Sequence, residues 1–508
     1  MQPLPDQSDN TRWLQLQGEA ALTFDGQLPP GINRLMIKEA TLDHTQLQKV
    51  WQNSDSLKAL HLEELGLPDG LPAMLYSLER LQSLSLIMLS PGPDFGEDED
   101  FIQSLPDGIA ALSALKELEL CENELTSLPS DLHQLPLDAL DLSDNSLSAK
   151  AIPLLPDTLR SLTVSYNPLG EVPEAIRQCS QLEELDLGSC QLSTLPGWLA
   201  ELPIKTLRIS HNTGLQDLEH AFAIPTLEVL DLSSCGLESL PAHMDKAVRL
   251  RELSLTHNPL RQLRENIGQL QALEVLKADR CALSYIHEAL TSLGKLRTLV
   301  LSNNELKQLP RSFGKLHALE LLRVSHNELS QLPDMSGLHA LKQVDLSRNK
   351  LQTFPLSLYD CSALEVLEMN WNNVDQIGPS LAKLQNLRSL SVYSNYLLFF
   401  NDKVSELKQL EKLNLGYTRI KKLPDLSGCQ SLKELNLAGL YEIEDMQDAL
   451  KTLNCPWIHS LTLTDNHALQ DLPPNLDGFT LLKRINVNKT ALDSAQLRAR
   501  FPGTVIWP

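Results

Sequence analysis

A short motif with leucine at fixed positions recurs along this chain every 22 or 23 residues. It reads LRTLVLSNNELKQLP at 296–310, LELLRVSHNELSQLP at 319–333 and LKQVDLSRNKLQTFP at 341–355. Aligned on the first apolar residue, the repeats begin at Ile32 and the last begins at Leu482. A period of this length predicts a repeat architecture in which no unit buries its apolar face alone and each packs on its neighbours.

The motif LxxLxLxxNxLxxLP assigns a physical task to each of its positions. Apolar residues alternate in LxxLxL, which predicts a strand with one buried face. Successive repeats then stack their strands in parallel, about 4.8 Å apart. The residue that closes each strand is usually Asn, which can satisfy turn backbone groups that no strand pairing reaches. This column runs through Asn123, Asn145, Asn167, Cys190, Asn212, Cys235, Asn258, Cys281, Asn304, Asn327, Asn349, Asn372, Asn395, Thr418, Asn466 and Thr490.

The consensus resembles the leucine-rich repeat family, in particular its 23-residue type, found in Ras-suppressor and Scribble-like scaffolds and in many bacterial proteins. The resemblance implies an α/β fold: a right-handed, curved solenoid with a parallel β-sheet on its concave face and short helical or 3₁₀ turns outside. We expect an N-terminal cap at 1–31, a solenoid of about 20 repeats at 32–492 and a C-terminal cap at 493–508. TRWLQLQG and TVIWP should add strands and DSAQLRARF a short helix.

The regular pattern weakens near both ends of the repeat region. The first three repeats carry Ala40, Leu65 and Leu89 in the Asn position, and Leu440 occupies it near the end. An acidic insertion near 88–101, IMLSPGPDFGEDED with its flank, should form a surface loop. The loop either docks a partner or is a solvent-exposed loop without a binding role.

The stretch KADRCALS (277–284) raises the question of a reactive thiol, because Cys281 has charged neighbours. The repeat register answers it, since Cys281 falls in the Asn column and should be structural. Four other cysteines lie three residues before a repeat start, and Cys121 should point to the open face. Eight cysteines in 508 residues form no disulfide framework, and no CxxC suggests zinc.

The residues between the strand leucines should line the concave face and carry any function. They form an acidic zone that includes Glu119 and Asp141, then a basic zone, then three aromatic residues on successive repeats. The basic and aromatic candidates for partner binding are Lys277, Arg280, Arg323, His326, Arg348, Trp371, Tyr393 and Tyr417. Arg and aromatic residues together have the composition of a protein-binding hot spot. The alternative is that these side chains only keep the exposed face soluble.

Several other classes of function are disfavoured by the sequence. Glu119 and Asp141 lie on neighbouring repeats, but a wide solvated face does not raise a carboxyl pKa by desolvation. Nucleotide-binding and nucleophile-elbow motifs are absent from the sequence. We expect no enzyme activity, no cofactor and no metal. A formal net charge of −22 disfavours nonspecific nucleic-acid binding. No apolar run suggests a membrane span or a signal peptide, so we expect a cytoplasmic protein, unless it is exported without a cleavable signal.

The most consistent hypothesis is a non-catalytic scaffold that recognises a partner protein on its concave face. The basic zone suggests that the partner offers an acidic segment, and we expect a monomer. Two alternatives stay open: a regulatory inhibitor that wraps an enzyme, and a secreted bacterial effector made of a bare repeat array.

Overall fold

The computed structural model describes residues 13–24, 28–29, 31–52, 56–90 and 101–507. Most of the predicted acidic insertion, and part of the predicted N-terminal cap, lie outside these residues. The chain forms two compact units. The first comprises residues 1–237 and 243–250, and the second comprises residues 238–242 and 251–508.

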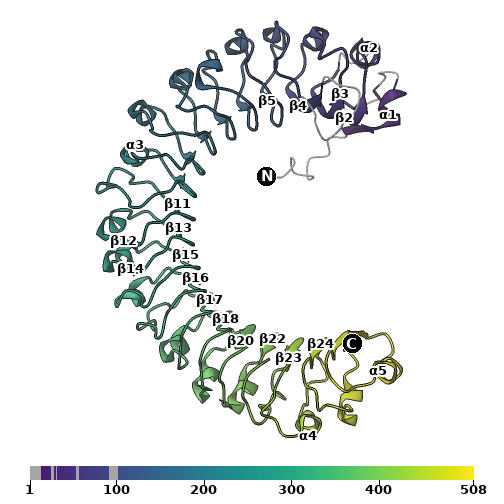
Figure 1. The fold of residues 1–508 in the computed structure, drawn as a ribbon, viewed down its shortest axis with the longest axis vertical. Coiled ribbons are helices and arrows are strands. Elements are labelled where there is room, and N and C mark those ends of the chain that lie inside the picture. The colour runs from purple at the N-terminus through teal and green to yellow at the C-terminus, as the bar shows by residue number, and fades with distance from the viewer. Residues whose placement is uncertain (1–12, 25–27, 30, 53–55, 91–100, 508) are drawn as a thin grey trace. The chain divides into compact units, whose positions relative to one another are not determined.

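In the first unit, consecutive repeats contribute strands that pair in parallel, each with the next along the chain. The strands are β1 (Trp13–Gln17), β2 (Arg34–Thr41), β3 (Ala59–Gly66), β4 (Ser83–Ser90), β5 (Glu117–Glu119), β6 (Ala139–Asp141), β7 (Ser161–Thr163), β8 (Glu184–Asp186), β9 (Thr206–Arg208) and β10 (Val229–Asp231). The other side carries α1 (Glu19–Leu22), α2 (His44–Gln52), η1 (Ala73–Ser77), η2 (Ile109–Ala111), η3 (Leu132–Gln134), η4 (Ala149–Ala151), η5 (Glu174–Gln178), η6 (Gly197–Glu201) and α3 (Glu219–Phe222), where η denotes a 3₁₀ helix. This is the predicted arrangement of sheet and short helices (Figure 1).

The second unit repeats the arrangement. Its main strands are β11 (Glu252–Ser254), β13 (Val275–Lys277), β15 (Thr298–Val300), β16 (Leu321–Arg323), β17 (Gln343–Asp345), β18 (Val366–Glu368), β20 (Ser389–Ser391), β22 (Lys412–Asn414), β23 (Glu434–Asn436), β24 (Ser460–Thr462), β25 (Arg484–Asn486) and β26 (Val505–Trp507). Two minor parallel pairs join β12 (Gln262–Leu263) to β14 (Tyr285–Ile286) and β19 (Gln376–Ile377) to β21 (Phe399–Phe400). The helices are η7 (Glu265–Gln269), η8 (Glu288–Ser292), η9 (Phe313–Lys315), η10 (Leu356–Asp360), η11 (Pro379–Lys383), η12 (Asp402–Glu406), α4 (Met446–Lys451), η13 (Pro474–Gly478) and α5 (Ser494–Arg500). None of the described helices is long and apolar enough to cross a bilayer.

Leucines at matching repeat positions form the core of each unit. The central residues of neighbouring strands, such as Leu276, Leu299 and Leu322, are in register and fully buried. Burying each such side chain contributes about 1.5–3 kcal/mol relative to leaving it exposed. The residues on either side of this leucine stand on the opposite surface of the sheet, which we call the open face. Function can therefore vary on the open face without disturbing the core.

The Asn column forms the predicted hydrogen-bonded ladder, as Asn304 illustrates. Its Oδ1 accepts from the N–H groups of Cys281 and Leu283, both at 2.9 Å. Its Nδ2 donates to the carbonyls of Ala278 and Leu301, both at 2.8 Å. One side chain thus satisfies buried donors and acceptors of two repeats, which would each cost about 1–3 kcal/mol if left unpaired.

Cysteine replaces Asn in this column where the preceding turn itself satisfies one of the two N–H groups that an Asn side chain would accept. Cys190 and Cys281 both follow a repeat containing Asn-Pro-Leu. In those turns Leu169 and Leu260 donate their N–H to the carbonyl of their own repeat's Asn, at 2.8 Å in each case. A thiol then suffices: Cys281 Sγ donates to Leu255 O at 3.1 Å and accepts from the Asn258 N–H.

The first repeats differ because they have no Asn in the column. Strands β2, β3 and β4 continue through the Asn position, so that Ala40 pairs with Leu65 and Leu65 pairs with Leu89. From β5 onward the strands end before the Asn. The apolar column residues of the first repeats thus coincide with longer strands, whereas β23 is short although Leu440 stands in its column.

Candidate functional site

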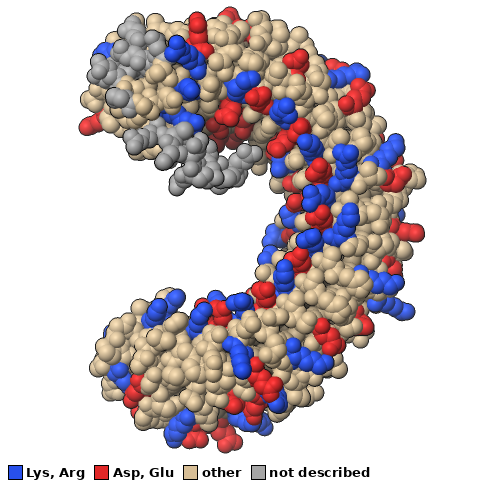
Figure 2. All heavy atoms as spheres, turned by 180° about the vertical axis from the view of Figure 1, so that it is seen from behind, with Lys and Arg blue, Asp and Glu red and all other residues tan. Residues whose placement is uncertain are grey.

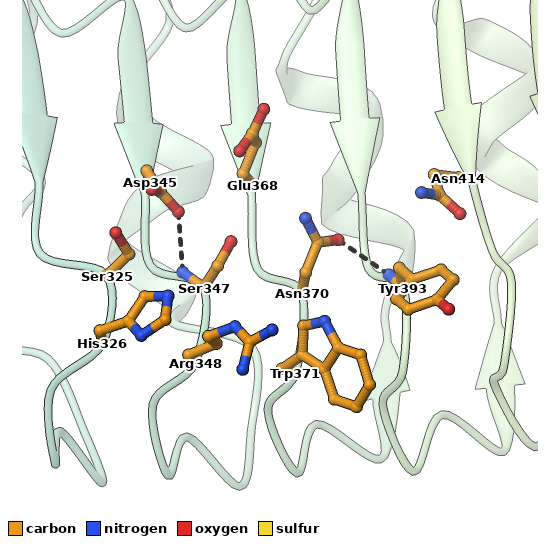
Figure 3. Close-up of a pocket in the computed structure, with 10 residues that line it drawn as sticks. All are labelled: Ser325, His326, Asp345, Ser347, Arg348, Glu368, Asn370, Trp371, Tyr393 and Asn414. Atoms are coloured by element: carbon orange, nitrogen blue, oxygen red, sulfur yellow. Dashed lines mark hydrogen bonds between the residues drawn. The ribbon is translucent and has the colours of Figure 1, made fainter. Parts of the chain in front are cut away.

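A hollow of about 420 Å³ lies on the open face of the second unit, over the ends of strands β16 to β22. Figure 3 shows the residues that line it, with the Arg348 guanidinium directed toward the Trp371 ring. The lining residues are Ser325, His326, Asp345, Ser347, Arg348, Glu368, Asn370, Trp371, Tyr393 and Asn414. Four of the predicted site residues therefore meet in one place: His326, Arg348, Trp371 and Tyr393.

The backbone holds Arg348 and Trp371 in a fixed orientation. Each occupies the position before the column Asn and has a positive φ, 54° for Arg348 and 56° for Trp371. Their N–H groups donate to Asn370 O at 2.7 Å and Tyr393 O at 2.8 Å. The Arg348 guanidinium carbon lies 5.1 Å from the centre of the Trp371 ring, within cation–π range, and Trp371 is 48% exposed. The pair places a cation beside a half-exposed aromatic ring on the open face.

The aromatic residues form a continuous row that is longer than the sequence predicted. Trp371 and Tyr393 have ring centres 5.6 Å apart, and Tyr393 and Tyr417 have theirs 5.1 Å apart, both edge-to-face. The row then continues to Tyr441 and His467, at 6.2 Å and 6.3 Å. The sequence does not predict Tyr441 and His467, because each stands one residue after the Asn column, outside the positions expected on the open face. We call these five residues the aromatic row.

Of the other predicted cations, Lys277 and Arg323 have acidic neighbours, and Arg280 contacts a histidine. Lys277 Nζ lies 2.6 Å from Glu252 Oε1, and Arg280 Nη1 lies 3.1 Å from His257 Nε2. Arg323 lines a second hollow with Asp279, Asp345 and Glu368. Positive and negative side chains intermingle over the surface shown in Figure 2. The predicted basic zone is therefore a mixed-charge surface, because neighbouring strands place Asp and Glu between the cations.

Burial changes the acidity of carboxyl groups on the open face, contrary to the expectation from the sequence. It raises the pKa of Glu368, and the charge of Asp345 adds to the effect while Arg323 opposes it. In the first unit, burial also raises the pKa values of Glu122 and Asp186. The closely packed side chains of neighbouring strands exclude enough water to desolvate these groups.

The predicted acidic pair of the first unit is engaged in local hydrogen bonds. Glu119 and Asp141 stand in register on β5 and β6. Glu119 Oε2 accepts from Ser85 Oγ at 2.6 Å, and Asp141 Oδ1 accepts from Ser143 N at 2.8 Å. Cys121 has its Sγ 3.8 Å from Glu119 but is buried, so it is less open than predicted. Among the described residues, no group of three or more His, Cys, Asp or Glu could hold a metal ion.

Comparison with known families agrees with the repeat geometry. A model of the leucine-rich repeat region matches residues 215–502, more than half of the chain, and a model of the single leucine-rich repeat matches residues 181–202. The chain belongs to the leucine-rich repeat family. A comparison of this leucine-rich repeat protein with curated proteins finds no match.

Solved structures support the same fold for this leucine-rich repeat protein. A leucine-rich repeat protein of Leptospira interrogans is 22% identical with a TM-score of 0.56, over 92% of this chain and 99% of that one. The plant peptide hormone receptor RGFR1, in complex with RGF2, is 20% identical with a TM-score of 0.61, over 97% and 79%. TLR13, in complex with ssRNA13, is 21% identical with a TM-score of 0.55, over 96% and 82%. At these identities the likeness concerns the fold.

Proposed function

We propose that this protein is a non-catalytic recognition scaffold that binds a partner protein through the open face of its second unit. The contact centres on the hollow between Arg348, Trp371 and Tyr393. The observation that carries the proposal is the half-exposed Trp371, stacked against Arg348 above a hollow of about 420 Å³. Arg and aromatic residues beside a concavity are the usual anchors of protein interfaces.

The rigidity of this face favours binding. Backbone hydrogen bonds hold the main chain of Arg348 and Trp371, the Trp371 ring contacts Arg348 and Tyr393, and Tyr393 also contacts Tyr417. Little conformational entropy is lost when such preorganised side chains engage a ligand. Among proteins of the same fold, RGFR1 is in complex with RGF2 and TLR13 with ssRNA13. A net charge of −22 favours a protein partner over a nucleic acid here.

The mixed charges refine the chemistry of the partner. Arg323 and Arg348 suit acidic groups, whereas Asp345 and Glu368 suit basic ones, so we propose a partner segment that carries both signs. An acidic partner segment, a monomeric state and a cytoplasmic location stay predictions.

The test is a quantitative pull-down from the cells that make the protein, with Trp371→Ala and Arg348→Ala as the test variants. Leu356→Ala is the matched control, because Leu356 is 75% exposed on η10, on the helical side of the unit. Loss of a hot-spot residue costs about 2 kcal/mol or more, which lowers affinity about 30-fold. We expect one set of captured proteins to disappear with both test variants and to stay with the control. Equal capture by all three variants would contradict the proposal.

A further inference from the structure

We infer that the open face adjoining the hollow, from Asn414 to Asn486, binds a proline-rich partner segment in the polyproline II conformation. The inference rests on the proposed function and specifies the class of partner. Its evidence is a row of amide donors, a fixed row of aromatic rings and the spacing of the repeats.

The amide donors are three Asn side chains at the ends of β22, β23 and β25. Asn414, Asn436 and Asn486 each accept, through Oδ1, the backbone N–H two residues further on, at 3.1, 2.9 and 3.1 Å. A backbone N–H can only donate, so the atom facing it must be oxygen. Each Nδ2 is therefore directed away from the turn, and it has no hydrogen-bond acceptor among the described residues. We call these three residues the amide row.

The turn itself does not require an amide. In other repeats the same position is Asp, and its Oδ1 makes the same bond: Asp141 accepts from Ser143 N, Asp231 from Ser233 N and Asp345 from Ser347 N. Asp leaves a charged acceptor facing outward, whereas Asn leaves a neutral donor. The amide row thus converts this part of the face from one that attracts donors and cations into one that attracts carbonyl oxygens.

The aromatic row lies beside the amide row and is held in place by glycines. A Cβ on Gly416 would lie 3.1 Å from the Tyr393 ring, and a Cβ on Gly439 would lie 2.7 Å from the Tyr417 ring. Each ring therefore packs on the glycine backbone of the next repeat. The Tyr417 hydroxyl also donates to Asp465. The rings are a preformed apolar platform.

A proline-rich segment complements both rows. Its carbonyl oxygens are free of internal hydrogen bonds and can accept from the amide row, and proline contributes no N–H that would need an acceptor. Its pyrrolidine rings fit aromatic-lined grooves, the usual mode of polyproline recognition. Preformed polyproline II also loses little entropy on binding.

The spacing selects this conformation over an extended strand. Neighbouring strands lie about 4.8 Å apart, so every second repeat recurs at about 9.6 Å. Polyproline II recurs every three residues, at about 9.3 Å. A β-strand presents the same side every two residues, at about 6.7 Å, which matches neither one repeat nor two. Asn436 on β23 and Asn486 on β25 are two strands apart, because β24 pairs with both.

The test is binding of a fluorescein-labelled ten-residue oligoproline to the full chain, followed by fluorescence anisotropy. A Gly-Ser peptide of equal length and label is the ligand control. We expect the oligoproline to bind at least 10-fold more tightly than the Gly-Ser peptide. The double variant Asn436→Asp/Asn486→Asp keeps both turn bonds but removes both donors, and it should weaken binding at least 10-fold. Asp231→Asn, the reciprocal change in the first unit, should leave binding unchanged.

Each other outcome would overturn the inference. Equal affinity for the two peptides would show that polyproline is not selected, and an unaffected double variant would show that the amide row is not used. If the chain bound the oligosaccharide cellohexaose and did not bind oligoproline, the ligand of this face would be a carbohydrate and not a proline-rich segment. Loss of the cellular partner with Trp371→Ala, without oligoproline binding, would overturn this inference and leave the proposed function intact. No effect of Trp371→Ala on the pull-down would overturn the proposed function.

Discussion

Replacing Cys281 by Asn or by Asp distinguishes a structural cysteine from a reactive one. Cys281 is fully buried, and its Sγ donates to Leu255 O at 3.1 Å and to Asp279 O at 3.4 Å. In Cys281→Asn, Nδ2 can donate to the same carbonyls, each bond contributing about 1 kcal/mol. Its Oδ1 can accept from the Asn258 N–H, which now faces the sulfur, but not from the Leu260 N–H, which is already used by Asn258 O. Gains and losses of about 1 kcal/mol per hydrogen bond then nearly cancel, so the net change should stay within about 2 kcal/mol.

Cys281→Asp has no donor for those carbonyls when ionised and buries an unpaired charge. An uncompensated buried charge lowers the free energy of unfolding by about 3–5 kcal/mol. Domains of roughly this size lose about 2–4 °C in Tm per kcal/mol, so we expect Cys281→Asp to melt at least about 2 °C below Cys281→Asn at pH 7.

The pH dependence of this difference has a defined sign. Burial raises the pKa of the new carboxyl above its unfolded value of about 3.9, so the destabilisation is present at neutral pH and disappears as the pH falls to about 4. Thermal unfolding followed by circular dichroism at pH 7 and pH 4 measures it. Equal Tm values at pH 7, or a gap that widens on acidification, would refute the ladder role of Cys281.

Three further predictions concern the glycines, the thiols and Tyr417. Gly439→Ala should lower the free energy of unfolding by about 1–3 kcal/mol, because φ at Gly439 is +59° and the new Cβ would meet the Tyr417 ring. Urea denaturation measures this loss. The control Gly478→Ala should leave the free energy of unfolding nearly unchanged, because there is open space around its Cβ. All eight cysteines are buried, and burial raises their pKa values, so a thiol-disulfide reagent at pH 8 should modify none within minutes until the chain is unfolded; rapid modification of any native thiol would contradict this. The Tyr417 hydroxyl and Lys489 both lower the pKa of Asp465, so Tyr417→Phe should raise it. Carbon-13 NMR titration of the Asp465 carboxyl measures the change. An unchanged pKa would show that the hydrogen bond from Tyr417 to Asp465 is absent.

Most of the fold could be predicted by aligning the repeats on their recurring leucines. The strands and their parallel pairing follow from LxxLxL, and the strands at Trp13–Gln17 and Val505–Trp507 and the helix at Ser494–Arg500 lie where the sequence places them. The Asn ladder was also predictable, since a buried turn must satisfy its backbone groups and Asn carries both a donor and an acceptor. Because Cys281 falls in this ladder, the sequence predicts a buried structural cysteine and not a reactive one.

The candidate site was only partly predictable, because pairings across strands depend on side-chain reach and packing. Trp371, Tyr393 and Tyr417 fall on successive repeats in the sequence, and their rings do meet. Lys277 forms an ion pair with Glu252, which lies on the neighbouring strand, one repeat of 23 residues earlier. This ion pair neutralises a positive charge that, from the sequence alone, we expect to be free for a partner.

The sequence by itself determined the repeat, the buried leucines and the ladder, because these depend on periodic local patterns that every unit must satisfy. Only the tertiary structure decided which way the side-chain amides of Asn414, Asn436 and Asn486 face, since a backbone N–H in each turn captures Oδ1 and leaves Nδ2 outward. It also decided how the rings pack on glycines and how neighbouring charges neutralise each other. These features arise between repeats, where distances of a few ångströms set the chemistry that the surface presents.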